Sequence, residues 1–170
     1  MNKIPELLFS LLIAFFSLQS CSYSEGTFTA KADDVFTLEL PNYLSSTRQL
    51  APGAQIQFKN RYRTVYVVGL YDAKGEAKDL DAYDERVIER FSMDLQNFES
   101  ELLSEKTENG LTKRKYRLSG NTTGEKIEYL LLTSEDENHY YQVCVWTLDF
   151  RLEKYEEDLE AILASFERTK

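Results

Sequence analysis

Two segments of this chain are apolar at both odd and even positions, and this constrains the fold more than any other feature. They are Val65–Tyr71 and Tyr140–Leu148, and the segment 126–133 has a similar character. A strand with this pattern lies inside a sheet that is covered on both faces. We therefore expect a central sheet with a further layer packed on each side.

Two amphipathic helices can supply those layers. Apolar residues recur at helical spacing from Leu80 to Phe98, directly after Asp79, whose carboxylate suits a helix N-cap. A second stripe of apolar residues at helical spacing runs over 152–166, and the opposite face of that predicted helix is acidic. Asn109-Gly110 favours a tight hairpin, so the later strands are expected to be antiparallel. The sequence predicts an α/β fold, a three-layer α/β/α sandwich with a mainly antiparallel sheet of about six strands.

The first twenty residues have the pattern of an export signal. Lys3 precedes the apolar run Leu7–Leu18, which is too short to cross a bilayer, since crossing takes about 20 residues. The run ends in Leu18-Gln19-Ser20-Cys21, which resembles a bacterial lipobox. That resemblance implies a cleaved lipoprotein signal peptide over 1–20 and a lipidated Cys21. The alternative is an ordinary secretory signal cleaved nearby, with Cys21 and Cys144 as a candidate disulfide pair.

The rest of the chain is expected to form one domain. Residues 21–34 comprise the lipidated cysteine and a segment rich in Ser, Thr, Gly, Lys and Asp without apolar periodicity, which predicts a flexible tether that reaches roughly 40 Å. Residues 35–170 alternate strand and helix patterns without a break in composition, repeat or low-complexity block. We expect a single globular α/β domain there, large enough to bury a core.

Composition excludes several functions. Lys and Arg number 20 against 29 Asp and Glu, a net charge of −9 that disfavours binding to nucleic-acid phosphates. Two cysteines and the single histidine, His139, leave little material for a metal site, and the sequence holds no nucleophile elbow, zinc-protease motif or phosphate-binding glycine loop. We expect no catalytic residue, no cofactor, no metal and no nucleic-acid partner, and hence a protein that is not an enzyme.

Two sets of residues are candidates for a partner surface. The first is a cluster of cations on one predicted strand: Lys113, Arg114, Lys115 and Arg117. They could dock an acidic partner or a lipid headgroup, protect an edge strand, or pair with the acidic last helix. The second set is three tyrosines near predicted loops or strand ends: Tyr43, Tyr62 and Tyr140. If they converge, they would form an aromatic site for a sugar or peptide.

The order of elements resembles the PsbP-like fold, which is shared by PsbP, DcrB and bacterial domains of unassigned function. The likeness spans about residues 35–166. The matching segments are Phe36–Pro41 with Tyr43-Leu44, Tyr66-Val67-Val68, Tyr140–Val143 with Trp146-Thr147, and Leu163–Phe166. The resemblance implies a non-catalytic assembly, binding or accessory factor, often near a membrane. The ion-binding histidines of the photosynthetic members have no counterpart to carry over here.

These expectations combine into one hypothesis with two alternatives. The hypothesis is a lipoprotein of the bacterial cell envelope, held by Cys21 to the outer membrane in preference to the inner, with a non-catalytic binding or accessory role toward an envelope protein or small ligand. The first alternative is a small-ligand carrier, which needs an apolar pocket of roughly several hundred Å³ between sheet and helix. The second is an envelope hydrolase with paired carboxylates among Asp79, Asp81 and Asp84, which would have to face each other about 5–9 Å apart across a cleft.

Overall fold

The computed structural model describes residues 26–75, 77–108 and 110–169. Its centre is a seven-stranded sheet with the strand order β3-β4-β5-β9-β8-β7-β6. Every neighbouring pair in this sheet is antiparallel. The strands are β3 (Ser45–Ser46), β4 (Ile56–Asn60), β5 (Val65–Ala73), β6 (Gln96–Glu108), β7 (Leu111–Thr122), β8 (Glu125–Glu135) and β9 (His139–Leu148).

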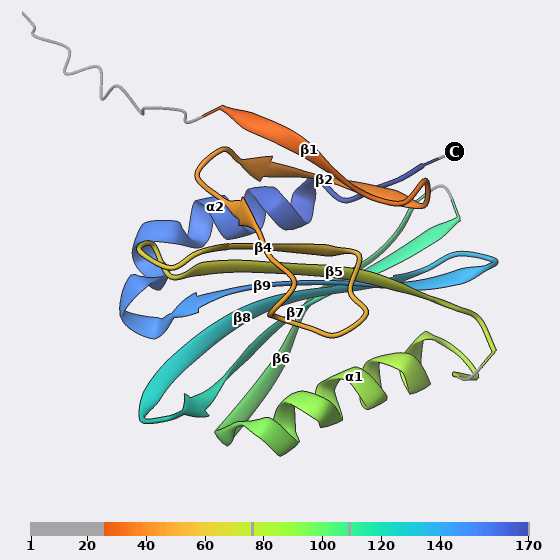
Figure 1. Cartoon of the computed structure of the whole chain (residues 1–170). Coiled ribbons are helices and arrows are strands. Elements are labelled where there is room, and N and C mark those ends of the chain that lie inside the picture. Colours follow the sequence, from red (N-terminus) through yellow and green to blue (C-terminus); the bar gives the residue numbers. More distant parts are fainter. Residues whose placement is uncertain (1–25, 76, 109, 170) are drawn as a thin grey trace, which may run out of the picture.

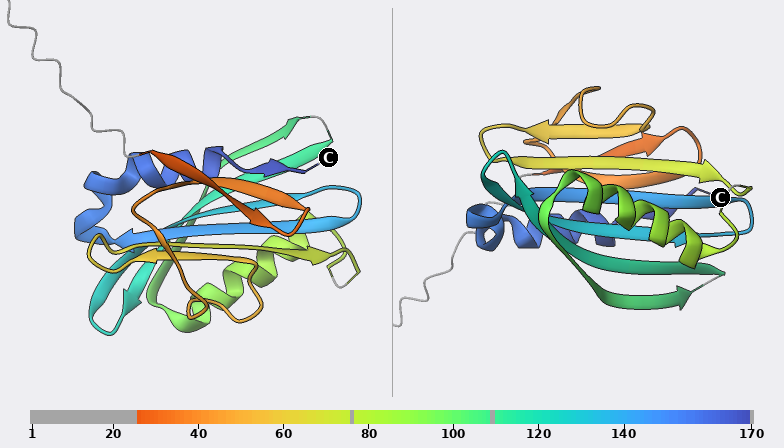
Figure 2. Two further views of the ribbon diagram at one scale, coloured as in Figure 1. Left: turned by 45° about the horizontal axis from the view of Figure 1, so that its top comes forward. Right: turned by 90° about the horizontal axis from the view of Figure 1, so that it is seen from below.

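A layer covers each face of this sheet, as the sequence predicted. Helix α1 (Leu80–Asp94) packs on one face, and helix α2 (Leu152–Ala164) packs on the other beside a small three-stranded sheet (Figures 1 and 2). The small sheet has the order β1-β2-β10. Its strands are β1 (Thr27–Ala32), β2 (Phe36–Pro41) and β10 (Glu167–Arg168). The three-layer α/β prediction is confirmed, with the small sheet as an addition to one outer layer.

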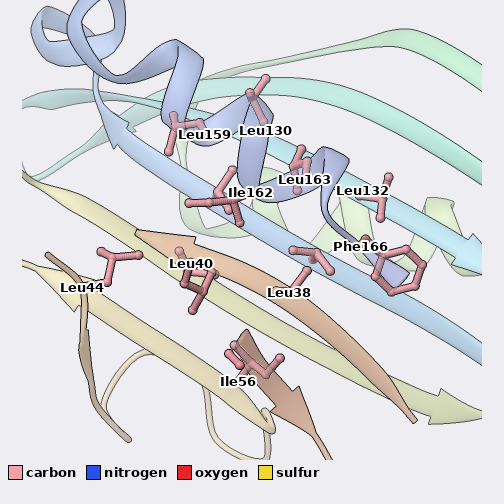
Figure 3. Close-up of a cluster of buried hydrophobic side chains, with 14 of the residues drawn as sticks. Leu38, Leu40, Leu44, Ile56, Leu130, Leu132, Leu159, Ile162, Leu163 and Phe166 are labelled. Carbon is pink, nitrogen blue, oxygen red and sulfur yellow. The ribbon is translucent and has the colours of Figure 1, made fainter. Parts of the chain in front are cut away.

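The central strands supply two hydrophobic cores from alternate residues. In β9, Val143 and Val145 face α2 and the small sheet, whereas Tyr140 and Cys144 face α1. Figure 3 shows the first core, in which leucines of β2 lie close to apolar residues of α2 such as Ile162. This double use of one strand is the reason for its apolar character at both parities.

The predicted tether is wrong beyond residue 26, because β1 lies inside it. This strand pairs with β2 along its whole length, from Thr27 opposite Pro41 to Ala32 opposite Phe36. Its buried side chains include two alanines, Ala30 and Ala32, and such small residues give a weak hydrophobic signal. The predicted signal peptide and Cys21 lie outside the described residues.

The chain after α1 also differs from the prediction. The apolar stripe suggested a helix that continues to Phe98, but α1 ends at Asp94 and Leu95 is already extended, at φ −116°. Strand β6 follows at the edge of the sheet, with most of its side chains exposed. An edge strand whose side chains are mostly exposed does not require alternating apolar residues, so the sequence of β6 shows no strand pattern.

Within the described ranges, no helix is both long and apolar enough to cross a membrane.

Candidate functional site

A groove of about 450 Å³ lies on the α1 face of the central sheet. Its floor includes Val68 and Leu70 of β5 and Cys144 of β9. One wall is α1, which contributes Val87, and the other is the loop 47–55 between β3 and β4, which contributes Leu50–Pro52. With Tyr129 of β8, the groove combines residues from five elements between Leu50 and Trp146.

The loop wall is fixed by one buried side chain, that of Gln57 on β4. Its Oε1 accepts hydrogen bonds from the backbone N–H groups of Leu50 and Ala51 at 3.0 and 3.1 Å. Its Nε2 donates to the carbonyl groups of Ala51 and Ala54 at 2.8 and 3.1 Å. These four bonds use the full capacity of the amide, so the loop is held against the sheet.

An aromatic row crosses three neighbouring strands beside this groove. Trp146 of β9 lies opposite Tyr66 of β5 and opposite Tyr129 of β8. The ring centroids of Trp146 lie 5.2 Å from Tyr66, nearly parallel at 13°, and 5.6 Å from Tyr129. Phe91 of α1 packs edge-on against Tyr129 at 5.1 Å. The indole has an aromatic neighbour on each side, and Trp146 and Tyr129 both line the groove.

Three polar side chains complete the lining: Gln142 on the floor, and Arg90 and Asp94 one turn apart on α1. Within the described part of the chain, none of the three makes a hydrogen bond or ion pair, nor does the indole N–H of Trp146 make a hydrogen bond. An apolar floor with a few unengaged polar groups is the usual composition of a small-molecule site. Burial raises the pKa of the Cys144 thiol, which makes it a poor nucleophile.

The carboxylates that were considered for hydrolysis lie near the start of α1 and are engaged in other contacts. Asp79 caps the helix, since its Oδ1 accepts from the N–H of Ala82 at 2.9 Å. Arg114 of β7 donates to Asp81 at 2.6 Å and to Asp84 at 2.9 Å. These contacts join the start of the helix to the sheet, and the three carboxylates line no part of the groove.

The four candidate cations of β7 divide between the two faces of the sheet. Arg114 points to α1, as described above, whereas Lys115 binds Glu160 at 2.8 Å and Arg117 binds Glu156 at 2.6 Å on α2. Lys113 donates to the carbonyl of Phe166 at 3.1 Å. Strand β7 is not an edge strand, because it lies between β6 and β8. Two of the four cations therefore pair with glutamates of α2 and a third contacts Phe166, two residues beyond it, so the pairing with the acidic last helix is present.

The three candidate tyrosines do not converge. Tyr43 lies near the β4–β5 turn, where its hydroxyl donates to Asp158 at 2.7 Å, and Tyr62 in that turn is 94% exposed. Tyr140 lies at the opposite end of the sheet, buried and stacked on Tyr83 at a centroid distance of 4.7 Å. The aromatic row instead consists of residues from the central strands, and sequence could not find it because strand register was unknown.

His139 and its acidic turn form a structural cluster around the buried carboxylate of Asp136. The backbone N–H groups of Asn138 and His139 donate to its Oδ1, both at 2.8 Å. The hydroxyl of Tyr141 and the guanidinium of Arg168 donate to its Oδ2 at 2.7 and 2.9 Å. Burial alone would raise the pKa of Asp136, but these four hydrogen bonds outweigh it and hold the pKa well below its usual range.

No group of three or more histidine, cysteine, aspartate or glutamate side chains in the described ranges is arranged to hold a metal ion.

Comparison with known proteins identifies the fold. No protein-family model matches the sequence, and no curated protein sequence matches it. Among solved structures, cyanobacterial PsbP (CyanoP) from Synechocystis sp. PCC 6803 is similar, with a TM-score of 0.59 and 16% identity over 89% of this chain and 98% of that one. LpqN from Mycobacterium tuberculosis gives a TM-score of 0.56 and 13% identity over 85% of this chain and 91% of that one.

A third similar structure is the Ran-binding protein Mog1p from Saccharomyces cerevisiae. It gives a TM-score of 0.55 and 10% identity over 86% of this chain and 97% of that one. At these identities the likeness establishes the architecture alone. The chain has a PsbP-like fold, as the sequence predicted.

Proposed function

We propose that this chain is a lipid-anchored accessory protein of the bacterial cell envelope whose domain binds a ligand without transforming it. The observation that carries the proposal is the groove between α1 and the loop 47–55. Its volume of about 450 Å³ lies in the range of small-molecule sites. Its apolar floor and unengaged Gln142, Arg90 and Asp94 provide both a driving force and orientation for a small amphipathic ligand.

The cellular location rests on the start of the chain. Leu18-Gln19-Ser20-Cys21 follows an apolar run of signal-peptide length, and a diacylated cysteine there would hold the domain on the outer membrane. The structural neighbour LpqN is involved in cell envelope biogenesis of Mycobacterium tuberculosis, which supports an envelope role. The membrane through Cys21 and a ligand in the groove are thus the two proposed partners.

A non-catalytic role is supported by the state of the reactive groups. Asp79 caps α1, and Asp81 and Asp84 are both ion-paired with Arg114. The thiol of Cys144 in the groove floor has its pKa raised by burial. None of these groups has the opposed acid and base that hydrolysis would need.

A small-ligand carrier is the form of this function that the groove favours. One polar group, Gln142, lies in the otherwise apolar floor and two, Arg90 and Asp94, lie on the α1 wall, and such a concave lining suits one compact molecule better than a protein surface. Arg90 suits an anionic group on that molecule, because a guanidinium binds oxyanions in a planar, two-pronged geometry. The Gln142 amide offers both a donor and an acceptor.

The test uses 8-anilinonaphthalene-1-sulfonate, an aromatic sulfonate, as the probe ligand. Trp146 is the sole tryptophan and lines the groove, so energy transfer from it measures binding of the probe, and the variants below test whether the groove is the site. We expect saturable binding at one site. Gln142→Phe, which fills the floor and removes the amide, should weaken the Kd by about tenfold.

Gln96→Phe is the matched control, because Gln96 is exposed on β6 and lies outside the groove. It should leave the Kd within about twofold of the wild-type value. Thermal unfolding of both variants establishes that each is folded. Equal affinities for wild type and Gln142→Phe, with both folded, would exclude the groove as the ligand site.

A further inference from the structure

Two exposed aromatic side chains lie at one end of the central sheet. Tyr62 is 94% exposed in the β4–β5 turn, and Phe150 is 70% exposed just after β9. Strands β5 and β9 are neighbours, and the hydroxyl groups of Thr64 and Thr147 lie 3.3 Å apart where the strands meet this end. The β4–β5 turn and the end of β9 lie at the same end of the sheet (Figure 1), so the two aromatic residues belong to segments at that end.

The described chain enters the fold at this same end. The N–H of Asn42 donates to the carbonyl of Gly26 at 2.9 Å, and the amide of Asn60 donates to the carbonyl of Tyr43 at 2.8 Å. The guanidinium of Arg63 lies over the Tyr43 ring, 4.1 Å from its centroid. These contacts place the start of β1 next to the turn that carries Tyr62.

The connection to the proposed lipid anchor is short. Because β1 begins at Thr27, residues 22–26 alone separate it from Cys21. Fully extended, those five residues span about 17 Å, well below the roughly 40 Å expected from sequence. If Cys21 is lipidated, as the proposed function states, this end of the domain cannot leave the bilayer surface by more than about that distance.

The side chains at this end suit the interfacial region of a lipid bilayer. Tyrosine rings favour the headgroup level, and an exposed phenyl ring gains by leaving water. The guanidinium of Arg151 lies 5.4 Å from the centroid of the Phe150 ring, and Arg61 beside Tyr62 is exposed. The nearby Asp149 is paired with Lys126 at 2.9 Å, and because Lys126 also binds Glu128 at 2.7 Å, this group of three side chains keeps one net negative charge.

We propose that Tyr62 and Phe150 insert into the headgroup region of the membrane that holds the lipidated Cys21. This inference rests on the proposed anchoring and adds a second attachment. One lipid anchor leaves the domain able to rotate on its short connection, whereas two inserted rings fix which end faces the bilayer. We attribute the contact to insertion of the aromatic rings and not to attraction between basic residues and anionic lipid, because exposed Glu153 nearby balances part of the positive charge.

The experiment places one tryptophan at this end and measures its contact with lipid. In a Trp146→Phe background, Tyr62→Trp makes the only indole in the chain. The full chain is lipidated in bacteria and reconstituted into vesicles of phosphatidylethanolamine and phosphatidylglycerol whose acyl chains are brominated near the headgroup. We expect bromine to reduce the Tyr62→Trp fluorescence by about half, because an indole at the headgroup level lies beside the bromine atoms.

The matched control is Asn138→Trp in the same background. Asn138 is exposed in the turn before β9, at the end of the sheet opposite Phe150. Its fluorescence should change by less than about a tenth, because the domain length separates it from the lipid. A third variant, Phe150→Trp, should behave like Tyr62→Trp.

Flotation of the vesicles distinguishes a failure of the lipid anchoring from a failure of the aromatic insertion. Protein that floats with the vesicles but shows equal quenching at residues 62 and 138 overturns the insertion and leaves the anchoring intact. Protein that does not float, with an N-terminal mass that lacks acyl groups, overturns the anchoring and the insertion with it.

Discussion

At the scale of single residues, Asp136 shows how one carboxylate can join distant parts of a chain. It accepts two backbone hydrogen bonds inside the β8–β9 turn and one from the Tyr141 hydroxyl within β9. It also binds Arg168 of β10 at 2.9 Å. The end of the chain is thus fastened to a turn of the central sheet.

Replacing this carboxylate should destabilise the domain. Asp136→Asn replaces one carboxylate oxygen, which accepts two of the four hydrogen bonds, by an amide donor, so we expect a loss of about 2 kcal/mol in the free energy of unfolding at pH 7. Urea denaturation measures it. Glu137→Gln, an exposed neighbour in the same turn, should change stability by less than about 0.5 kcal/mol.

The same residue should give the domain an acid-sensitive component of stability. Because the pKa of Asp136 is lowered in the folded state, its contribution is fully present above the unfolded value, near pH 4, and is lost as the pH falls toward the folded value. The wild type should therefore lose stability below about pH 4 more steeply than Asp136→Asn does. Parallel curves would show that this carboxylate contributes nothing to acid sensitivity.

At the scale of elements, the loop 47–55 depends on Gln57 for its position. The sequence places Gln57 at a polar position of an alternating strand, which predicts a solvent-facing side chain. The structure buries it at 7% exposure under the loop, with all four hydrogen bonds directed to loop backbone. Nothing in the pattern of β4 distinguishes Gln57 from its polar neighbours, so this residue could not be identified from sequence.

Removing this amide should release the wall of the groove while the sheet persists. Gln57→Leu loses the four bonds, and we expect unfolding free energy to fall by about 1–3 kcal/mol. Affinity for the aromatic sulfonate should fall as well, because Leu50–Pro52 would no longer be fixed. Hydrogen exchange at the amides of Leu50 and Ala51 should accelerate.

Gln55→Leu is the comparison for this variant, since Gln55 is exposed in the same loop and does not line the groove. It should leave exchange and affinity unchanged. If exchange at Leu50 were unaltered in Gln57→Leu, the loop would have to be held by contacts other than this amide.

The elements that sequence predicted well share one property, which is a strong periodic pattern. Strand β9 is apolar at both parities because it supplies both cores, and α2 has one apolar stripe because one face is buried. Strand β5 has the same pattern because Val65 and Val67 face one core while Val68 and Leu70 line the groove on the opposite face. Strands β1 and β6 lack such patterns, since one buries alanines and the other is mostly exposed. The groove and its aromatic row could not be predicted from sequence for a further reason. They depend on the strand register that places Trp146 opposite Tyr66 and Tyr129.

At the scale of the whole molecule, the two cores share the central strands. Leu159 of α2 is fully buried in one core, while Val87 of α1 belongs to the other. Strands β8 and β9 contribute side chains to both. The layers are therefore expected to unfold together.

A cavity in either core should lower the stability of the whole domain, which should still unfold in a single transition. Leu159→Ala should lower the unfolding free energy by about 3 kcal/mol, as for other buried leucines. Fluorescence of Trp146, which lies on the α1 face, and far-UV circular dichroism should still give coincident curves. Separate midpoints would show that the α1 side can persist without the α2 side.

The edge strand β6 has a consequence for how the protein behaves at high concentration. Among the described residues no strand pairs with its outer side, and an open edge of this length could recruit a second chain and seed fibrils. Its pairing with β7 shifts register twice, between Gln96 and Glu99 and between Leu102 and Ser104, and Asn97 has φ 51°. Such kinks deny an incoming strand a straight template, so close packing of many copies need not lead to polymerisation.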